Sequence, residues 1–535
     1  MARPVAGDGA KRPRRDRTRG ASWEEREQVI KPLGVVLQPP AEPGERAIFP
    51  TVYVPDRILV SARRDAQEVA DALNKEFADS GIRLSLERSP LAFQRRARRR
   101  SGNGGPAVTR LLLVSEPDAK PGAPDAWAVL RDAARRGVDL TGVGLDHLLT
   151  VGPIGMNPFT STNPFASTNP FTSTNPFTST NPFTSTNPFT STNPASTGLG
   201  SYALPGYGGR QPVAWIGGPP PRTEHGSHDR PVVMVLDTGC GEHDWFGPGV
   251  VERRVEVDGH PIGRTSTSDD PEVNPDLVGP LDGQIDPIAG HGTFIAGIVL
   301  QACPEAVILT PRIADSLGRV IESDLIDALD QVAELVRRHD QKIDGGRRID
   351  VLNMSLGYYH ETPADVLFSD GLRDVLLEIT DAGCAVVCSA GNDATDRPMF
   401  PAAFPGESGS APLVSVGACN PNRRTVALYS NTAPWVDLYA RGTAVVSTFP
   451  SFNGGAQAVT SRPAHGKARE AIDPDDFSGG FAVWSGTSFA APLVAGTIAA
   501  RLDAAAADGG WPAKVSERVG RAEKIAAALA EERPL

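Results

Sequence analysis

The sequence predicts an α/β protein whose larger part is a doubly wound parallel sheet, preceded by a small α+β domain and a repetitive linker. From about residue 211, apolar runs of strand length alternate with helix-like segments, which is typical of a parallel sheet covered on both faces. Residues 50–150 show shorter strand-like and helix-like patterns. Between the two parts a hexapeptide recurs from Asn157 onward, and its polar residues build no apolar face.

Length and composition are those of a globular protein with several domains. A chain of 535 residues is too long for one ordinary domain. Its 40% hydrophobic and 22% charged residues are typical of a soluble protein, and the net charge of −11 favours solubility. The sequence has no run of 18 or more apolar residues and no apolar core near its N-terminus. We therefore expect no membrane partner, no secretory signal and a cytoplasmic location, with non-standard export as the open alternative.

Cysteine and arginine usage adds two further expectations. The five cysteines are few and odd in number, which fits a reduced, intracellular setting. Cys384 and Cys388 lie in one apolar run, where a strand would separate them by about 13 Å, beyond disulfide reach. Basic residues cluster at 11–19 and 95–100. Such runs can contact nucleic acid, but no nucleic-acid motif accompanies them, and we interpret them as solvated tails and loops.

The first part of the chain predicts a tail followed by a small domain. Residues 1–45 are rich in Arg, Pro and Gly and are typical of a disordered basic tail. Residues 46–150 follow the order β-α-β-β-α-β, the split arrangement of a ferredoxin-like domain. Its expected strands are 57–62, 83–89, 109–116 and 138–143, and its expected helices are 66–77 and 125–136.

Residues 151–210 predict a disordered linker. Asn-Pro-Phe-Thr-Ser-Thr starts at positions 157, 163, 169, 175, 181 and 187, with Ala166 in place of one Thr. Each Pro removes a backbone donor and pushes the preceding Asn toward extended geometry. A six-residue period also resembles a parallel β-helix, but Pro in every coil argues against that alternative. Asn-Pro-Phe is also a docking tripeptide for adaptor modules in eukaryotes, which the bacterial-looking composition disfavours.

Residues 211–512 predict the doubly wound sheet, and residues 513–535 predict a C-terminal helical extension. Catalytic groups in such folds gather at the carboxyl ends of the strands, so polar residues there are candidates for a site. The expected strands are 231–237, 306–310, 350–355, 384–390 and 413–418, and the expected helices are 293–302, 323–339 and 370–383.

Three polar residues stand at such positions. Asp237 ends the first of these strands, His291 opens an apolar helix between two glycines, and Ser488 lies just inside another helix start. Alone they are ordinary as a turn residue, a helix-start residue and a helix cap. Their joint occurrence in this order within one α/β domain argues against three unrelated structural roles.

The chain resembles the subtilase family of serine proteases in five motifs that occur in the family's order. Two further blocks accompany those of Asp237, His291 and Ser488. The block that ends in Asn392 is similar to the strand that ends in the family's oxyanion Asn, and the block that ends in Gly357 resembles the edge that binds substrate backbone. The motifs are Asp237-Thr238-Gly239, Gly290-His291-Gly292-Thr293, Asn353-Met354-Ser355-Leu356-Gly357, Ser389-Ala390-Gly391-Asn392 and Gly486-Thr487-Ser488-Phe489-Ala490-Ala491-Pro492.

The resemblance implies a serine endopeptidase that hydrolyses polypeptide substrates through an acyl-enzyme. Ser488 would be the nucleophile, His291 the general base and acid, and Asp237 the residue that orients the imidazole. Asn392 would stabilise the oxyanion. Two alternatives stay open. One is a non-catalytic binding protein that keeps the fold as a scaffold, and the other is esterase or peptide-ligase chemistry through the same intermediate.

Four residues are candidates for substrate binding. By resemblance, Ser355, Leu356 and Gly357 would offer backbone groups to an extended peptide, with a plain core strand as the alternative. Met399 lies in a stretch that resembles one wall of the family's primary specificity pocket. It would leave a shallow apolar pocket that favours small or medium apolar side chains.

Calcium is the cofactor that the resemblance suggests. Family calcium sites are loop carboxylates, and Asp244, Asp269 and Asp270 are available. No diagnostic spacing is present, so we assign no cofactor and no metal ligand. The sequence also departs from the family at Arg441, where a Pro is usual, and in a long polar segment between Ser447 and Ser485.

The resemblance also suggests a role for residues 46–150. Subtilases are commonly preceded by a ferredoxin-like prodomain that assists folding and inhibits the site until it is cleaved. We therefore expect an intramolecular contact of 46–150 with the active site, and self-cleavage between about 150 and 212. The linker would tether the inhibitor and set its effective concentration. A permanent interaction domain is the alternative.

Overall fold

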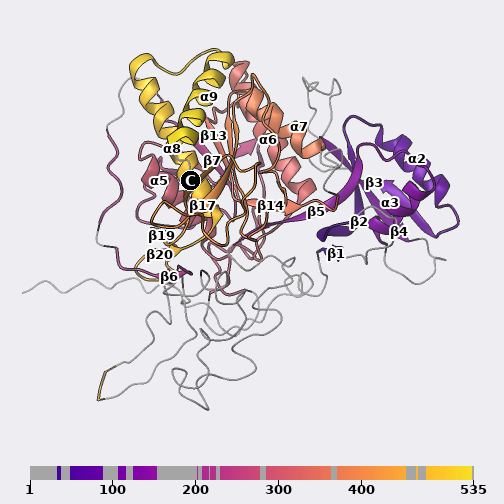
Figure 1. Ribbon diagram of the computed structural model, residues 1–535, viewed down its shortest axis with the longest axis horizontal. Coiled ribbons are helices and arrows are strands. Elements are labelled where there is room, and N and C mark those ends of the chain that lie inside the picture. The colour runs from indigo at the N-terminus through magenta and orange to yellow at the C-terminus, as the bar shows by residue number, and fades with distance from the viewer. Residues whose placement is uncertain are drawn as a thin grey trace, which may run out of the picture.

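The computed structural model has two units, and the smaller, N-terminal one lies beside the larger one (Figure 1). The hexapeptide repeats, both basic clusters and most of the expected N-terminal tail lie outside the described residues. The structure describes residues 33–37, 48–87, 107–115, 124–152, 202, 208–215, 217–223, 229–277, 285–362, 370–452, 465–467 and 477–532.

The larger unit is built on a seven-stranded sheet with the order β18-β17-β15-β13-β7-β11-β8. All of its strand pairs are parallel, which confirms the predicted parallel sheet. Every residue of β7 is buried, because both faces of the sheet are covered. The strands are β7 (Val232–Leu236), β8 (Val251–Glu252), β11 (Val307–Leu309), β13 (Val351–Met354), β15 (Ala385–Ser389), β17 (Leu413–Cys419) and β18 (Leu438–Arg441).

Helices cover the two faces of this sheet. Val233 and Val235 of β7 belong to one core with α5, α8 and α9, whereas Met234 points into a second core with α6 and α7. Helix α9, expected as a separate extension, contributes Val519 and Leu529 to the first core. The helices are α5 (His291–Ala302), α6 (Glu322–Asp340), α7 (Asp370–Asp381), α8 (Thr487–Gly509) and α9 (Val515–Glu532).

Helix α8 runs through the first core with Ser488 as its second residue. Within the described part of the chain, it is the one helix whose length and apolar composition would suffice to cross a membrane. Of its most apolar window, 61% is buried inside the protein. All five cysteines are buried and free.

The N-terminal unit has the element order β2-α2-β3-β4-α3-β5, and its antiparallel sheet has the strand order β5-β2-β4-β3. Asp65 and Asp125 cap the two helices by accepting backbone N–H groups of the first turn. The elements are β1 (Val35–Leu37), β2 (Thr51–Ser61), α2 (Ala66–Glu76), β3 (Ile82–Leu86), β4 (Val108–Ser115), α3 (Ala126–Arg135) and β5 (Val143–Val151).

Two sequence predictions in this unit are wrong. Of the expected strand 138–143, residues 138–140 have no regular secondary structure and residues 141–142 form a turn, where Asp139 accepts a hydrogen bond from Thr141 N and Gly142 has φ +70°. The strand starts at Val143 instead. Residues 35–37 fall in the expected disordered tail, yet they form β1, because Val35–Leu37 pairs with the start of β2.

Strand β5 extends from the N-terminal unit into the larger one (Figure 1). It pairs with β2 in its own sheet and, antiparallel, with β12 and β14 of the larger unit. Leu149 and Val151 are fully buried in the core that holds α6 and α7. The remaining strands are β6 (Gln211–Pro212), β9 (Glu256–Val257), β10 (His260–Pro261), β12 (Arg319–Ile321), β14 (Leu356–Tyr359), β16 (Met399–Phe400), β19 (Val445–Thr448) and β20 (Phe481–Trp484).

Candidate active site

A buried carboxylate–imidazole pair lies at the carboxyl end of β7. Asp237 follows the last residue of β7, His291 is the first residue of α5, and both are fully buried. His291 Nδ1 lies 2.7 Å from Asp237 Oδ1, which also accepts the N–H of Thr238 at 2.8 Å. His291 Nε2 is buried with no hydrogen-bond partner among the described residues. The imidazole is therefore fixed on one side and available for a proton on the other.

The glycine after His291 permits the close approach of α5 to the end of β7. A Cβ atom on Gly292 would lie 2.0 Å from the carbonyl oxygen of Gly239. That separation is far below van der Waals contact, so a larger residue would push the helix start and its imidazole away from Asp237.

The helix that bears Ser488 packs against the imidazole. The rings of Phe489 and His291 have centroids 5.2 Å apart, and Trp484 meets His291 edge-on at 5.5 Å. Ser488 is 2% exposed, and its carbonyl oxygen accepts a 3.0 Å hydrogen bond from Ser355 Oγ. The structure thus brings the start of α8 to His291.

Asn392 lies three residues beyond β15 and faces the same helix start. Its Oδ1 accepts hydrogen bonds from Thr487 N at 2.8 Å and Thr487 Oγ1 at 2.9 Å, which fixes the orientation of the amide. Its Nδ2 then donates to the carbonyl oxygen of Gly152 at 3.0 Å. Gly152 directly follows β5, so the end of the N-terminal unit reaches the amide expected to bind an oxyanion.

Strand β5 lies between two edges of the larger unit. On one side Leu356 and Gly357 of β14 pair with Val151 and Thr150. On the other side β12 pairs antiparallel with β5, and Val151 N donates to Gly318 O at 2.7 Å.

The four residues expected to bind substrate have different positions in the structure. Leu356 and Gly357 pair with β5, whereas Ser355 bonds to the backbone of Ser488. Met399 is buried in β16, and a Cβ on Gly357 would lie 2.6 Å from its Cε. Met399 therefore lies directly behind the β14 edge.

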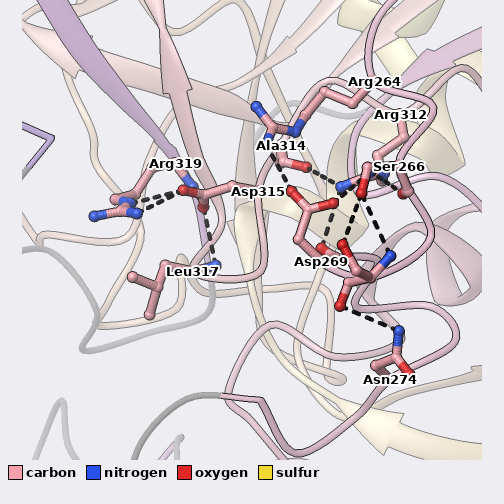
Figure 2. Close-up of polar contacts among 10 residues, drawn as sticks. Arg264, Ser266, Asp269, Asn274, Arg312, Ala314, Asp315, Leu317 and Arg319 are labelled. Carbon is pink, nitrogen blue, oxygen red and sulfur yellow. Dashed lines mark hydrogen bonds and ion pairs between the residues drawn. The ribbon is translucent and has the colours of Figure 1, made fainter. Parts of the chain in front are cut away.

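Figure 2 shows two carboxylates that hold loops of the larger unit in place. Asp315 accepts hydrogen bonds from the N–H groups of Leu317 and Arg319, both at 2.9 Å, and from Arg319 Nε at 2.8 Å. These bonds shape the turn that leads into β12.

The second carboxylate of Figure 2, Asp269, was one of the calcium candidates. Its oxygens accept from Arg312 Nη2 at 3.0 Å and from Arg264 Nη2 at 2.6 Å. Two guanidinium groups therefore compensate its charge, and they fix the loop on which Asp269 lies.

A buried ionic cluster joins β5 to the larger unit. His147 Nδ1 lies 2.6 Å from Glu322 Oε2, and His147 Nε2 lies 2.8 Å from Glu361 Oε2. Burial alone would lower the pKa of His147, but Glu361 and Glu322 raise it to about 10. Burial also raises the pKa of the neighbouring Asp146 to about 7.

The same cluster contains the metal-compatible group that the described residues offer. Possible ligand atoms of His147, His360 and Glu361 lie within 4.8 Å of one another, and all three residues are buried. Both ring nitrogens of His147 are already engaged by carboxylates. The arrangement is that of an imidazolium held between two anions.

Two residues near the site escaped sequence reasoning. Gly152 ends an apolar run just before the repeats, and that position is the one signal that could have identified it. Glu272 is buried at 3% exposure next to the start of α5, although it lies in a polar stretch that is typical of a surface loop. No sequence pattern marks it.

An α/β fold that presents a buried Asp–His pair beside a Ser-bearing helix is typical of serine hydrolases. The profile described as Subtilase family matches residues 228–529, more than half of the chain. The chain belongs to the subtilase family.

Several known proteins are similar to this chain. An intracellular serine protease of Paenibacillus polymyxa is 26% identical over 281 residues, which cover 50% of this chain and 65% of the relative. The major intracellular serine protease of Bacillus subtilis (strain 168) is 26% identical over 247 residues, which cover 43% of this chain and 64% of the relative. Subtilisin-like protease 5 of Trichophyton verrucosum (strain HKI 0517) is 26% identical over 276 residues, with 50% and 54% covered. The chain thus spans less than two thirds of each of these relatives.

Among solved structures, a cold adapted subtilisin-like serine proteinase is 21% identical, with 56% of this chain and 85% of that chain covered. Its TM-score of 0.33 is too low to bear on the fold or the site.

Proposed function

We propose that this subtilase is a serine endopeptidase kept latent by its own N-terminal unit. The observation that carries this proposal is the hydrogen bond from Asn392 Nδ2 to the carbonyl oxygen of Gly152. A peptide carbonyl held by a fixed amide, next to the helix of a buried Ser, is in the position of the carbonyl that such an enzyme attacks.

The catalytic roles follow from the polar contacts. His291 Nε2 takes the proton of Ser488 as the hydroxyl attacks, and later returns it to the leaving amine. Asp237 holds Nδ1–H at 2.7 Å and stabilises the imidazolium. Asn392 Nδ2 and the N–H of Ser488 at its helix N-terminus stabilise the oxyanion of the tetrahedral intermediate.

The substrate is an extended polypeptide. Edges β12 and β14 accept β5 as a middle strand, so any peptide with a free extended backbone can take the same place. Main-chain pairing gives affinity, and the apolar surface near Met399 favours small or medium apolar side chains.

The N-terminal unit, which we interpret as a ferredoxin-like prodomain, competes for that place. Its element and strand order support this interpretation. Side-chain ion pairs reinforce the docking of β5: Arg63 with Asp374 at 2.6 Å, and Arg110 with Asp327 at 2.9 Å. As long as β5 is docked, a substrate cannot pair with both edges.

Self-cleavage is expected between about 150 and 212. The bond that follows the Gly152 carbonyl joins Gly152 to Pro153. Proline has no N–H, and its ring crowds the preceding residue, so the leaving group at this bond is poor. We therefore propose that the docked strand is cleaved slowly and inhibits while intact.

An intracellular location is proposed on two grounds. Two of the relatives are named as intracellular serine proteases, and the five buried cysteines of this chain are free.

Hydrolysis of a peptide ester and of an unfolded protein substrate tests the proposed activity. A chain lacking residues 1–200, or full-length protein after self-processing, should hydrolyse both, and Ser488→Ala in the same form should lose at least about a thousandfold in kcat. Retention of activity by Ser488→Ala would contradict the proposal. Ester hydrolysis without cleavage of the protein substrate would favour an esterase.

A further inference from the structure

A buried glutamate lies directly behind the Asp237–His291 pair. Glu272 belongs to the loop between β10 and α5 and is 3% exposed. Both of its carboxylate oxygens accept hydrogen bonds from groups that flank the pair. These donors are Thr238 Oγ1 at 2.5 Å and Gly292 N at 2.8 Å for Oε1, and Thr293 Oγ1 at 2.5 Å for Oε2.

Glu272 supplies the acceptor that the start of α5 lacks. The helix begins at His291 after Gly290, which has φ +80° and no side chain that can cap. The first N–H groups of a helix have no partner within the helix, and its N-terminus favours a negative charge. The N–H of Gly292 is shared between Glu272 Oε1 at 2.8 Å and Thr238 Oγ1 at 2.7 Å, so the glutamate and the threonine together cap the helix start and fix the turn that carries His291.

Thr238 connects this glutamate to the catalytic carboxylate. Its hydroxyl oxygen lies 2.5 Å from Glu272 Oε1 and 3.1 Å from Asp237 Oδ1, and it has one proton to donate. When Glu272 is ionised, the proton goes to the nearer oxygen, and Asp237 keeps its charge for His291. When Glu272 is protonated, the hydroxyl can turn to Asp237 and weaken its hold on the imidazolium.

The loop that carries Glu272 is fixed at several points. Asp269 is paired with Arg264 and Arg312 (Figure 2). The Oδ1 of Asp270 accepts the N–H of Glu272 at 2.9 Å. Gly290 N donates to Pro271 O at 3.3 Å, which ties the loop to the residue before α5. The carboxylate is therefore held in place by its backbone as well as by its partners.

We propose that Glu272 is a positioning residue that holds Asp237 and His291 in their reactive arrangement and, when ionised, stabilises the imidazolium of His291. This inference rests on the proposed peptidase function. Glu272 does not contact the substrate, and it acts through Thr238 and the first turn of α5.

The surroundings of Glu272 set the pH range of this effect. Burial raises its pKa to about 7, and the negative charge of Asp270 adds to the increase. The other titratable or charged groups around it are Asp237 and Cys240 after β7, His291 of α5, and Arg253, which donates to the carbonyl oxygen of Cys240. The ionised, active form of Glu272 therefore increases as the pH rises through about 7.

The test compares three single variants with the wild-type full-length chain after any self-processing is complete. We expect Glu272→Gln to lower kcat for a peptide ester about tenfold at pH 8, because the charge is lost while the shape is kept. KM should change less than about twofold, since no substrate contact is lost. Glu305→Gln, which removes a carboxylate beyond the far end of α5, should leave both constants unchanged.

The pH profile of kcat distinguishes a positioning role of Glu272 from a purely structural one. The variant Asp270→Asn keeps a side-chain oxygen that can accept the N–H of Glu272, but it removes the negative charge. Asp270→Asn should therefore lower the pKa of Glu272 and shift the acid limb of kcat to lower pH. Glu272→Gln should make that limb less steep, because the carboxyl at this position no longer titrates.

Two results would overturn the inference while the proposed function stands. One is an active wild-type enzyme whose kcat is unchanged by Glu272→Gln. The other is a loss of kcat in Glu272→Gln that is fully explained by a smaller fraction of folded active sites. In that case the pH profile of kcat per active site would be unchanged in both Glu272→Gln and Asp270→Asn. A folded chain lacking residues 1–200 that neither hydrolyses the ester nor reacts at Ser488 would contradict the proposed function itself, and the inference with it.

Discussion

The two nitrogens of His291 have opposite environments. Nδ1 is bound to Asp237, while Nε2 is buried without a hydrogen-bond partner in the described chain. A buried polar atom without a partner is costly, and in a folded protein it commonly marks a functional position. The asymmetry favours the tautomer in which Nδ1 carries the proton and donates it to Asp237, while Nε2 has a free lone pair.

The amide of Asn392 gives the first prediction. Replacement by Ala removes the side-chain donor to the oxyanion, so we expect kcat for a peptide ester to fall by about 10²- to 10³-fold. KM should change little, because the bond is made mainly in the transition state. Asn422→Ala, in an exposed turn, is the matched control. An unchanged kcat in Asn392→Ala would remove this residue from the mechanism.

Sequence analysis identified the residues that lie in short motifs and missed those whose position depends on the packing of distant segments. Asp237, His291 and Ser488 each occupy the end of a strand or the start of a helix, positions that apolar runs predict. The structure places Asp237 directly after β7, His291 at the start of α5 and Ser488 in the first turn of α8. Glu272 lies in a polar loop, and its burial results from the packing of distant segments, which no local pattern encodes.

Strand β5 connects the two units because it pairs with strands of both. It belongs to the sheet of the N-terminal unit through β2, and its second half pairs with β12 and β14. Asp315 accepts hydrogen bonds within the turn that leads into β12, the strand that pairs with one side of β5 (Figure 2). Two strands placed on either side of β5 hold it by main-chain pairing, as in other cases where an extended chain is added to a sheet edge.

Pro153 gives a prediction about this strand. Replacement by Ala restores an ordinary leaving amine after Gly152, so self-cleavage at that bond should become at least about tenfold faster. Intact mass spectrometry of the full-length chain over time measures the rate. Pro158→Ala, within the repeats, is the matched control and should not change it. An unaltered rate in Pro153→Ala would show that the Gly152 bond is not the one presented to Ser488.

The last strand of the N-terminal unit also shows the limit of pattern reading. The apolar–polar pattern at 138–143 resembled a strand, whereas Asp146 and His147 interrupted the true one, 143–151, and concealed it. Both polar residues are buried because Ser323 and Glu322 of the larger unit bond to them. Only the docked arrangement of the two units satisfies these groups, so the sequence of this segment alone misleads.

Docking of the two units buries charge as well as apolar surface. The core of the larger unit includes Leu149 and Val151, and His147 carries a proton between Glu322 and Glu361. A pair of carboxylates around one imidazolium makes the interface sensitive to protonation. The N-terminal unit is therefore bound by contacts whose strength depends on pH.

The pKa of His147 determines the direction of this dependence. In the docked state it is raised from 6.5 to about 10. The stabilisation is therefore fully present below pH 6.5, and it is lost as the pH rises through about 10. Docking should weaken by up to about 1.4 kcal/mol per pH unit within this window.

Hydrogen exchange of β5 amides, corrected for intrinsic rates, measures this change. Ser488→Ala full-length protein should show falling protection of Leu149 and Val151 between about pH 7 and pH 9.5, within that window. The additional change His147→Gln should lower the protection and make it nearly independent of pH. Protection in Ser488→Ala that stays constant or rises over this range would contradict the assignment of His147.

The most direct test of the central claim is intact mass spectrometry after incubation with a fluorophosphonate probe. The unmutated chain and Ser488→Ala are compared, and a chain lacking residues 1–200 exposes the site if the N-terminal unit blocks it. We predict one label on Ser488 and release of an N-terminal fragment in the unmutated chain, with neither event in Ser488→Ala. A Ser488→Ala protein that still cleaves itself, or a truncated, folded chain that takes up no label, would contradict the proposal of a self-inhibited serine peptidase.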